Sequence, residues 1–191
     1  MNMHPKVFEA GFSLTELMST LAVIGLIAAA MLGVMNNLNT QSERMNTQTE
    51  LLTTGAQVFD LIEPWVALAG YREQSDALSP SDALEFIGTG HLKLCFDLDV
   101  ATRRRIEFRV DGQRLQQRIT DNDGCTADPA SDPGWDNVSE EILASIGFIR
   151  PLPDAPTLDV RLELEKLVPG TTETARTTMR KRMPLYALTA L

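Results

Sequence analysis

The first half of the chain contains one long apolar run. From Leu17 to Met35 no side chain is charged, and almost all are Leu, Ile, Val, Ala, Met or Gly. At 1.5 Å of rise per residue, a helix of this length crosses the hydrocarbon core of a bilayer. The pattern therefore predicts a transmembrane helix over residues 12–35.

The helical pattern continues beyond this run. Within residues 36–63, polar side chains alternate with apolar ones at helical spacing. These apolar residues are Leu38, Met45, Leu51, Leu52, Val58, Phe59, Leu61 and Ile62. No proline lies between Phe12 and Glu63. We therefore expect one continuous helix to Pro64, with a transmembrane half and an amphipathic half, weakened at Gly55 by about 1 kcal/mol relative to alanine.

After Pro64 the pattern changes to short alternating segments separated by Gly, Pro, Ser and Asp. Leu92–Leu98 and Arg105–Val110 alternate strictly, which is typical of strands. Asp111-Gly112 predicts a tight turn into a further strand at residues 114–119. Together these segments predict an antiparallel meander.

The last third of the chain gives two more strands. Leu158–Glu165 alternates apolar with charged residues, and Thr177–Leu188 is expected to pair with it across a turn at Pro169-Gly170. Val138–Gly147 fits either a short helix or a strand. The predicted fold class is α+β, with the long N-terminal helix packed on an antiparallel β-sheet head formed by residues 64–191.

One carboxylate stands at the start of the apolar run. Gly11 and Phe12 precede Ser-Leu-Thr-Glu, so that Glu16 begins a segment that is otherwise uncharged. An ionisable group in this position is costly in lipid and calls for a partner. The ten residues before Gly11 are polar and nearly balanced in charge, which indicates a cytoplasmic flank.

The sequence Gly-Phe-Ser-Leu-Thr-Glu-Leu-Met at residues 11–18 resembles the N-terminal signal of type IV pilins and of the pseudopilins of type II secretion. The resemblance implies that residues 1–11 are a cytoplasmic leader. A membrane prepilin peptidase would cut between Gly11 and Phe12 and methylate the new amino group of Phe12. Glu16 would then pair with the N-terminal amine of a neighbouring subunit in a filament.

Two further segments resemble PilW-type minor pilins. They are Trp65–Arg72, like the segment that closes the long helix in those proteins, and Val138–Ile149, which precedes two late strands. The resemblance implies a minor pilin-like subunit of a type IV pilus, acting in pilus initiation or tip assembly. Its partners would be the prepilin peptidase, other pilin subunits and, before assembly, the lipid of a bacterial inner membrane.

Localisation follows from the same resemblance. The chain would cross the inner membrane once, with its head in the periplasm, and would then enter the pilus or pseudopilus. Two alternatives stay open: a J-type minor pseudopilin of a type II secretion system, and a single-span, membrane-anchored periplasmic binding or sensor protein.

Cys95 and Cys125 are the only cysteines of the chain. Because an exported head meets an oxidising compartment, we expect them to form a disulfide, with two free buried thiols as the alternative. Closing this loop would contribute roughly 3 to 4 kcal/mol. Metal binding is not expected, since His91 is the only histidine outside the leader and no Cys-x-x-Cys spacing occurs.

Charge narrows the function classes further. The net charge of −9 argues against a nucleic-acid surface. Two local basic clusters, 103–105 and 176–182, are expected to be solvated faces or, alternatively, to dock an acidic neighbour. The acidic segment 121–136 can gather around Ca²⁺, but its spacing departs from the helix-loop-helix calcium pattern, so a solvated turn is favoured. No catalytic or cofactor motif is present, so neither an enzyme nor a cofactor is expected.

Overall fold

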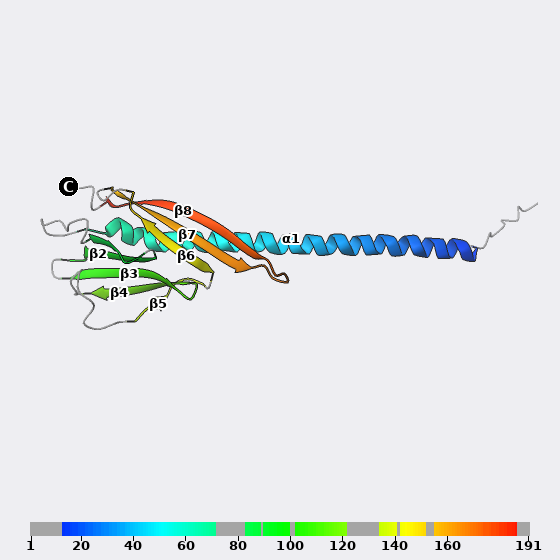
Figure 1. Ribbon diagram of the computed structural model, residues 1–191, viewed down its shortest axis with the longest axis horizontal. Helices are drawn as coiled ribbons and strands as arrows, with labels where there is room; N and C mark the ends of the chain where they lie inside the picture. The colour runs from blue at the N-terminus through cyan, green and yellow to red at the C-terminus, as the bar shows by residue number, and fades with distance from the viewer. Residues whose placement is uncertain are drawn as a thin grey trace, which may run out of the picture. The chain divides into compact units, whose positions relative to one another are not determined.

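The computed structural model describes residues 13–71, 83–88, 90–99, 102–121, 134–140, 142–151 and 155–186. The chain divides into two compact units, residues 1–43 and residues 44–191. One helix, α1, begins in the first unit and ends in the second, which also contains all of the described strands (Figure 1).

The described elements are α1 (Leu14–Leu68), β1 (Leu84–Phe86), β2 (His91–Asp97), β3 (Arg103–Asp111), β4 (Arg114–Asp121), β5 (Asp136–Asn137), β6 (Leu143–Ile149), β7 (Thr157–Leu167) and β8 (Thr174–Pro184). The strands form two antiparallel sheets, one in the order β1-β2-β3-β4-β5 and the other in the order β6-β7-β8. The predicted α+β class, a long helix with an antiparallel β head, is confirmed, although the strands form two sheets and not one.

In the first unit, α1 is apolar and exposed. Every described residue from 13 to 39 is solvent-accessible. The helix has the length and the hydropathy needed to cross a membrane. The transmembrane half is therefore confirmed as a candidate span by length and composition.

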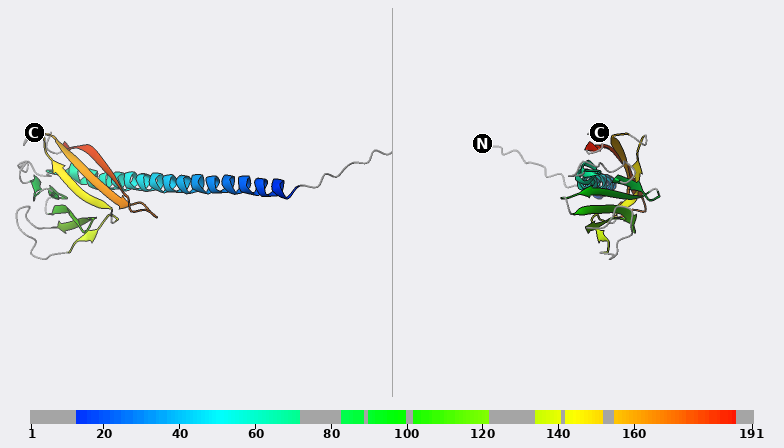
Figure 2. Two further views of the ribbon diagram at one scale, coloured as in Figure 1. Left: turned by 45° about the vertical axis from the view of Figure 1, so that its right-hand side comes forward. Right: turned by 90° about the vertical axis from the view of Figure 1, so that its left-hand side faces the viewer.

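In the second unit, one side of α1 packs on the strands. Its buried residues include Leu51, Val58, Phe59 and Ile62, which join one core with apolar side chains from both sheets. Figure 2 shows from two further sides that the strands of this unit lie against one side of its helical residues. A Cβ at Gly55 would overlap the Met179 sulfur and lie 3.3 Å from a Leu164 methyl group, so the Met179 side chain would have to move to admit it.

The predicted end of the helix at Pro64 is wrong, because α1 continues to Leu68. Proline removes one helical hydrogen bond, but packing holds the next turn in place. Trp65 stacks on Phe96 with ring centroids 6.0 Å apart, and Val66 is completely buried. Tertiary contacts therefore override the local stop signal.

Gly70 ends the helical path. Its φ of +84° is the left-handed conformation that glycine adopts readily after a helix. Its N–H donates to the carbonyl of Cys95 at 2.8 Å, and the Tyr71 carbonyl accepts from the N–H of Asp97 at 2.9 Å. The segment after α1 is thus fixed directly to β2.

The predicted meander is present as β2, β3 and β4. The turn after β3 has Gly112 at φ +56° and Gln113 at φ +64°, and Asp111 pairs with Arg114 across it. Two successive positive φ values are typical of the tight turn that joins twisted strands. Along β2, however, the alternation does not leave a solvent face, because Lys93 on the polar side is also buried.

The second sheet shows which of the two expected structures the segment Val138–Gly147 adopts. Residues 143–149 form strand β6, so the strand alternative for Val138–Gly147 is the correct one in this part. β7 and β8 pair along their whole length across the predicted turn, where Gly170 has a φ of +72°. A bulge between Leu143 and Ser145 interrupts the pairing of β6 with β7.

Candidate assembly interface

The first turn of α1 is closed by a reciprocal pair of hydrogen bonds. The N–H of Ser13 donates to Glu16 Oε2 at 3.1 Å, and the N–H of Glu16 donates to Ser13 Oγ at 3.3 Å. This is a capping box, and it places a carboxylate at the positive end of the helix dipole. Glu16 is therefore hydrogen-bonded within its own chain. Gly11 and Phe12 lie outside the described residues.

Beyond Glu16, α1 presents apolar side chains around its whole circumference. The large apolar residues from Leu14 to Met35 are all more than half exposed. A continuous exposed surface of this kind marks a contact with lipid or with another protein. Gly25 and Gly33 have open space where a side chain would be, so within the chain neither glycine is required by packing.

In the second unit, the exposed side of α1 is uncharged between Arg44 and Asp60. Its exposed residues there are Met45, Asn46, Gln48, Thr49, Leu52, Thr53, Ala56 and Gln57. Met45 is 68% exposed and Leu52 is 50% exposed. The solvent side of an ordinary amphipathic helix usually carries charged residues. This face is therefore suited to contact with a partner.

A groove runs beside this face, between α1 and the segment that follows β5. We call it the helix groove; its larger part has a volume of about 420 Å³ and is lined by Asn46, Thr49, Glu50, Thr53, Thr54, Gln57 and Glu140. An adjoining cavity of about 360 Å³ shares Thr54, Gln57 and Glu140 and extends to Asn137 and Ser139. The lining is polar, and its charged groups are carboxylates.

Ion pairs fix α1 to the β7-β8 hairpin. Lys181 on β8 donates to Glu63 at 2.8 Å and lies 3.7 Å from Asp60. The hydrogen bond to Glu63, together with the charge of both carboxylates, raises the pKa of Lys181. Lys166 pairs with Glu50 in the same way. These contacts fix the register of the helix on the sheet.

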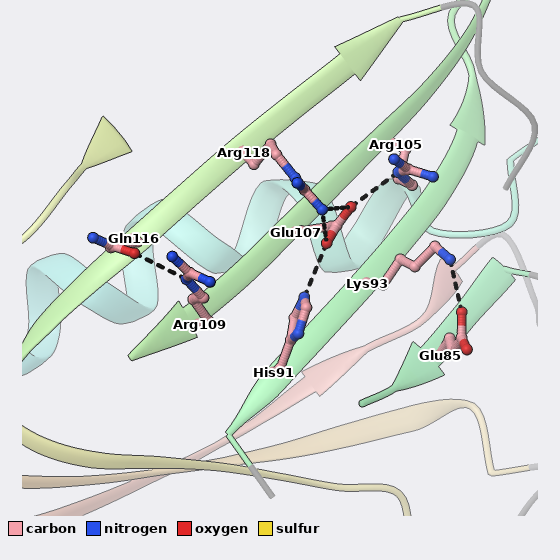
Figure 3. Close-up of polar contacts among 8 residues, drawn as sticks. All are labelled: Glu85, His91, Lys93, Arg105, Glu107, Arg109, Gln116 and Arg118. Atoms are coloured by element: carbon pink, nitrogen blue, oxygen red, sulfur yellow. Dashed lines mark hydrogen bonds and ion pairs between the residues drawn. The ribbon is translucent and has the colours of Figure 1, made fainter. Parts of the chain in front are cut away.

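A buried charge cluster lies on the first sheet (Figure 3). Glu107 on β3 is 3% exposed and contacts His91 Nε2 at 3.0 Å, Arg118 Nη2 at 2.9 Å and Arg105 Nε at 3.0 Å. Burial by itself would raise the pKa of Glu107, but the hydrogen bonds from His91 and Arg118 and the charges of Arg118 and Arg105 outweigh it and lower the pKa to about 2. Glu107 is therefore a buried carboxylate that stays ionised.

An aromatic side chain packs on the same cluster. The guanidinium carbons of Arg109 and Arg118 lie 4.0 Å and 4.6 Å from the centre of the Trp135 ring, and His91 meets the same ring edge-on. Cation–π contacts of this kind are favourable when the cation is partly desolvated. This cluster links three strands of the sheet and has a structural role.

The expectation that residues 103–105 form a solvated basic face is wrong for Arg105. This side chain is 1% exposed and pairs with Glu107, because the face of the sheet on which it stands is covered. Its neighbours are more accessible: Arg103 pairs with Asp97, and Arg104 with Asp121.

The second basic cluster is exposed, as predicted. β7 and β8 carry four arginines on the outer side of the second sheet, namely Arg161, Arg176, Arg180 and Arg182, which we call the arginine face. Beneath it, Asp159 is 2% exposed and accepts hydrogen bonds from Arg182 at 2.8 Å and Arg180 at 2.5 Å. These bonds lower the pKa of Asp159 to about 2.

The remaining predicted site residues are only partly described. Cys95 on β2 is buried and is not a free thiol, whereas Cys125 lies outside the described residues, so their pairing stays a prediction. Most of the acidic segment 121–136 also lies outside them. Among the residues that the structure describes, no group of three or more His, Cys, Asp or Glu side chains is arranged to hold a metal ion.

Sequence reasoning missed the partner that the structure gives to Glu16. The spacing Ser-x-x-Glu at residues 13–16 is the signature of a capping box and was sufficient to find it. By contrast, Asp159 and Glu107 occur in alternating segments like many solvent-facing residues. Their burial depends on strands that are distant in the sequence, so no local signal could have found them.

Comparison of the chain with known proteins finds no matching family model, no matching curated protein and no matching solved structure.

Proposed function

We propose that this chain is a pilin-like filament subunit, of the minor pilin class, that acts in the initiation or tip assembly of a type IV pilus. In this role the leader is removed after Gly11, Phe12 is methylated, and subunits associate through α1. The protein performs no reaction; it is processed by the prepilin peptidase and then assembled.

The observation that carries the proposal is the division of α1 into two chemically different halves. One carboxylate at the start of the helix is followed by an exposed apolar segment from Leu17 to Met35. The second half is held on two β-sheets by a buried apolar side and by ion pairs. Such a helix can be stored in a membrane and then transferred into a bundle of similar helices.

The uncharged exposed face between Arg44 and Asp60 supports the same role. Within the second unit, it gives the helix an exposed side without charge. Contact between subunits on this side can therefore form without burying an unpaired charge.

Expression of the full chain with and without a prepilin peptidase tests the proposal. With the peptidase, we expect the membrane-extracted product to lack residues 1–11 and to begin with a methylated Phe12, as measured by intact mass and N-terminal sequencing. A bulky Gly11→Val variant should remain uncut, whereas Gly25→Val, in the apolar run, should be processed normally. An uncut chain in the presence of active peptidase would contradict the proposal and favour a plain membrane anchor.

Assembly is tested separately with Glu16. The Glu16→Gln variant keeps the shape and one hydrogen-bond acceptor but loses the charge that a neighbour's amine would pair with. We expect it to be processed yet absent from sheared filaments, which immunoblotting can measure. Normal incorporation of this variant would show that the charge has no part in assembly.

A further inference from the structure

The arginine face places two like charges opposite each other. On the paired strands, Arg161 of β7 stands directly opposite Arg180 of β8. Like charges in this position repel each other. Each arginine is paired with a carboxylate of the same face, Arg161 with Glu163 at 2.9 Å and Arg180 with Asp159 at 2.5 Å. These ion pairs offset the repulsion and hold the two guanidinium groups apart.

Two of the three carboxylates that pair with these arginines lie well below them. The four arginine side chains are between 54% and 76% exposed, whereas the Asp159 and Glu165 side chains are 3% and 26% exposed; Glu163, the partner of Arg161, is 46% exposed. The guanidinium groups are therefore fixed in position and point outward. Because their positions are already set, little side-chain entropy would be lost when they bind an anionic surface.

The rest of the chain supplies the opposite charge. The protein has 26 acidic and 17 basic residues, so the chain as a whole is acidic. The helix groove contains two carboxylates: Glu50, which pairs with Lys166, and Glu140, which is exposed. Neutral side chains that accept hydrogen bonds, such as Asn46 and Gln57, lie beside them. A planar guanidinium with five N–H donors suits such a lining. The groove has no lining residue from β7 or β8.

We propose that the arginine face of one copy docks on the helix groove of a second copy, with Arg161 and Arg176 directed at Glu140. Because the two surfaces share no residue, the contact is heterologous and repeats in one direction. This contact requires neither leader cleavage nor a pilus. It can therefore be absent although the proposed function is correct, and it can be present although the proposed function is wrong.

Zero-length coupling between isotopically distinct copies tests the contact. The double variant R161K/R176K keeps both charges and adds amines that a carbodiimide joins to nearby carboxylates. Unlabelled full chains that carry the double variant and ¹⁵N-labelled full chains that keep both arginines are mixed in detergent micelles, coupled and digested, and mixed-isotope peptides are measured by mass spectrometry. We expect such peptides to join position 161 or 176 to Glu140, with a yield at least fivefold lower at 0.5 M NaCl, where the Debye length is only about 4 Å.

Two controls separate this contact from general association. R44K carries a similarly exposed amine outside the arginine face, since Arg44 is 48% exposed, and it should give no more mixed-isotope links than the wild-type chain. Glu140→Gln in the labelled copy should abolish the link while leaving the unfolding temperature unchanged, because Glu140 is exposed. The proposal is overturned by an absence of mixed links from the double variant, by equal yields from R44K, or by links that persist with Glu140→Gln.

Discussion

At the scale of the residue, Gly55 lies where the Met179 side chain of β8 packs on α1. Helix propensity alone describes this glycine as a weak point, and the sequence supports no more than that. The structure adds the reason for its presence, because Met179 occupies the space that a side chain would need. Close approach of a strand side chain to the helix backbone decides the residue type here.

Gly55→Ala is therefore expected to destabilise the protein by about 1 to 3 kcal/mol through overpacking, although alanine is the better helix former. Thermal unfolding of the full chain in detergent, followed by tryptophan fluorescence, measures the change. Gly33→Ala, at a position with nothing within 4 Å, should be neutral or slightly stabilising. Adding Met179→Ala to Gly55→Ala should recover part of the loss; without recovery, the steric explanation fails.

At the scale of the element, the end of α1 shows why local rules fail at one position. Pro64 is a strong stop signal, and the prediction from it placed the boundary one turn too early. The last turn is kept by Trp65 against Phe96 and by buried Val66, and these partners are contributed by a strand about thirty residues later in the sequence. Only the folded chain brings them together.

Trp65→Ala should therefore loosen this turn. We expect a loss of about 2 to 3 kcal/mol, somewhat less than for a completely buried tryptophan, because Trp65 is partly accessible. Hydrogen exchange should show faster exchange of the amides after Pro64, with the helix before Asp60 unaffected. Leu68→Ala, at a 40% exposed position in the same turn, is the matched control and should have little effect.

The strands show which part of the fold can be predicted from the sequence. The alternating segments that became β2, β3, β7 and β8 are long enough for a pattern of period two to be visible. β1 and β5, with three and two residues, carry no such pattern and were missed. The division into two sheets also escaped prediction, since it depends on which distant strand β6 pairs with.

At the scale of the whole molecule, two ionised carboxylates tie the stability of the head to pH. The pKa of Glu107 and that of Asp159 are both lowered to about 2, from ordinary values of 4.5 and 3.8. A group whose pKa is lower in the folded state stabilises that state above its unfolded pKa. This contribution is lost as the pH falls towards the folded pKa.

We therefore expect the unfolding temperature to be level near neutral pH and to fall as the pH is lowered from about 5 to 2. Differential scanning calorimetry of the full chain checks this. Glu107→Gln should make the decline shallower and lower the stability at pH 7, because Arg105 and Arg118 then lose the charge of Glu107. A stability that does not change between pH 5 and 2 would contradict the assigned role of both carboxylates.

The cysteine pair is a second constraint on the whole head. If Cys95 and Cys125 form one bridge, Cys125→Ser should lower the free energy of unfolding by roughly 3 to 4 kcal/mol. Alkylation of the unreduced, denatured protein should then leave the wild-type mass unchanged and add one group to the variant. Two alkylated thiols in the wild-type protein would disprove the bridge.

Part of the candidate site could be predicted from the sequence. Glu16 stands out because a charge beside an apolar run is rare, and the neighbouring residues supply a specific pattern. The exposure of the basic cluster 176–182 was predicted, but the place of Arg161 beside it and the buried Asp159 beneath it depend on the pairing of β7 with β8. The helix groove could not be predicted from the sequence, because its two walls come from segments that are distant in the sequence.

The place of β8 at the border of its sheet has one more consequence. A long strand with one free edge is normally a template for cross-chain pairing and amyloid-like growth. Antiparallel pairing of two β8 strands from different copies would bring Arg176, Arg180 and Arg182 of one close to the same residues of the other, with the Asp159 carboxylates already engaged. Such pairing would place like charges side by side, so the sequence of β8 disfavours strand-to-strand growth from this edge.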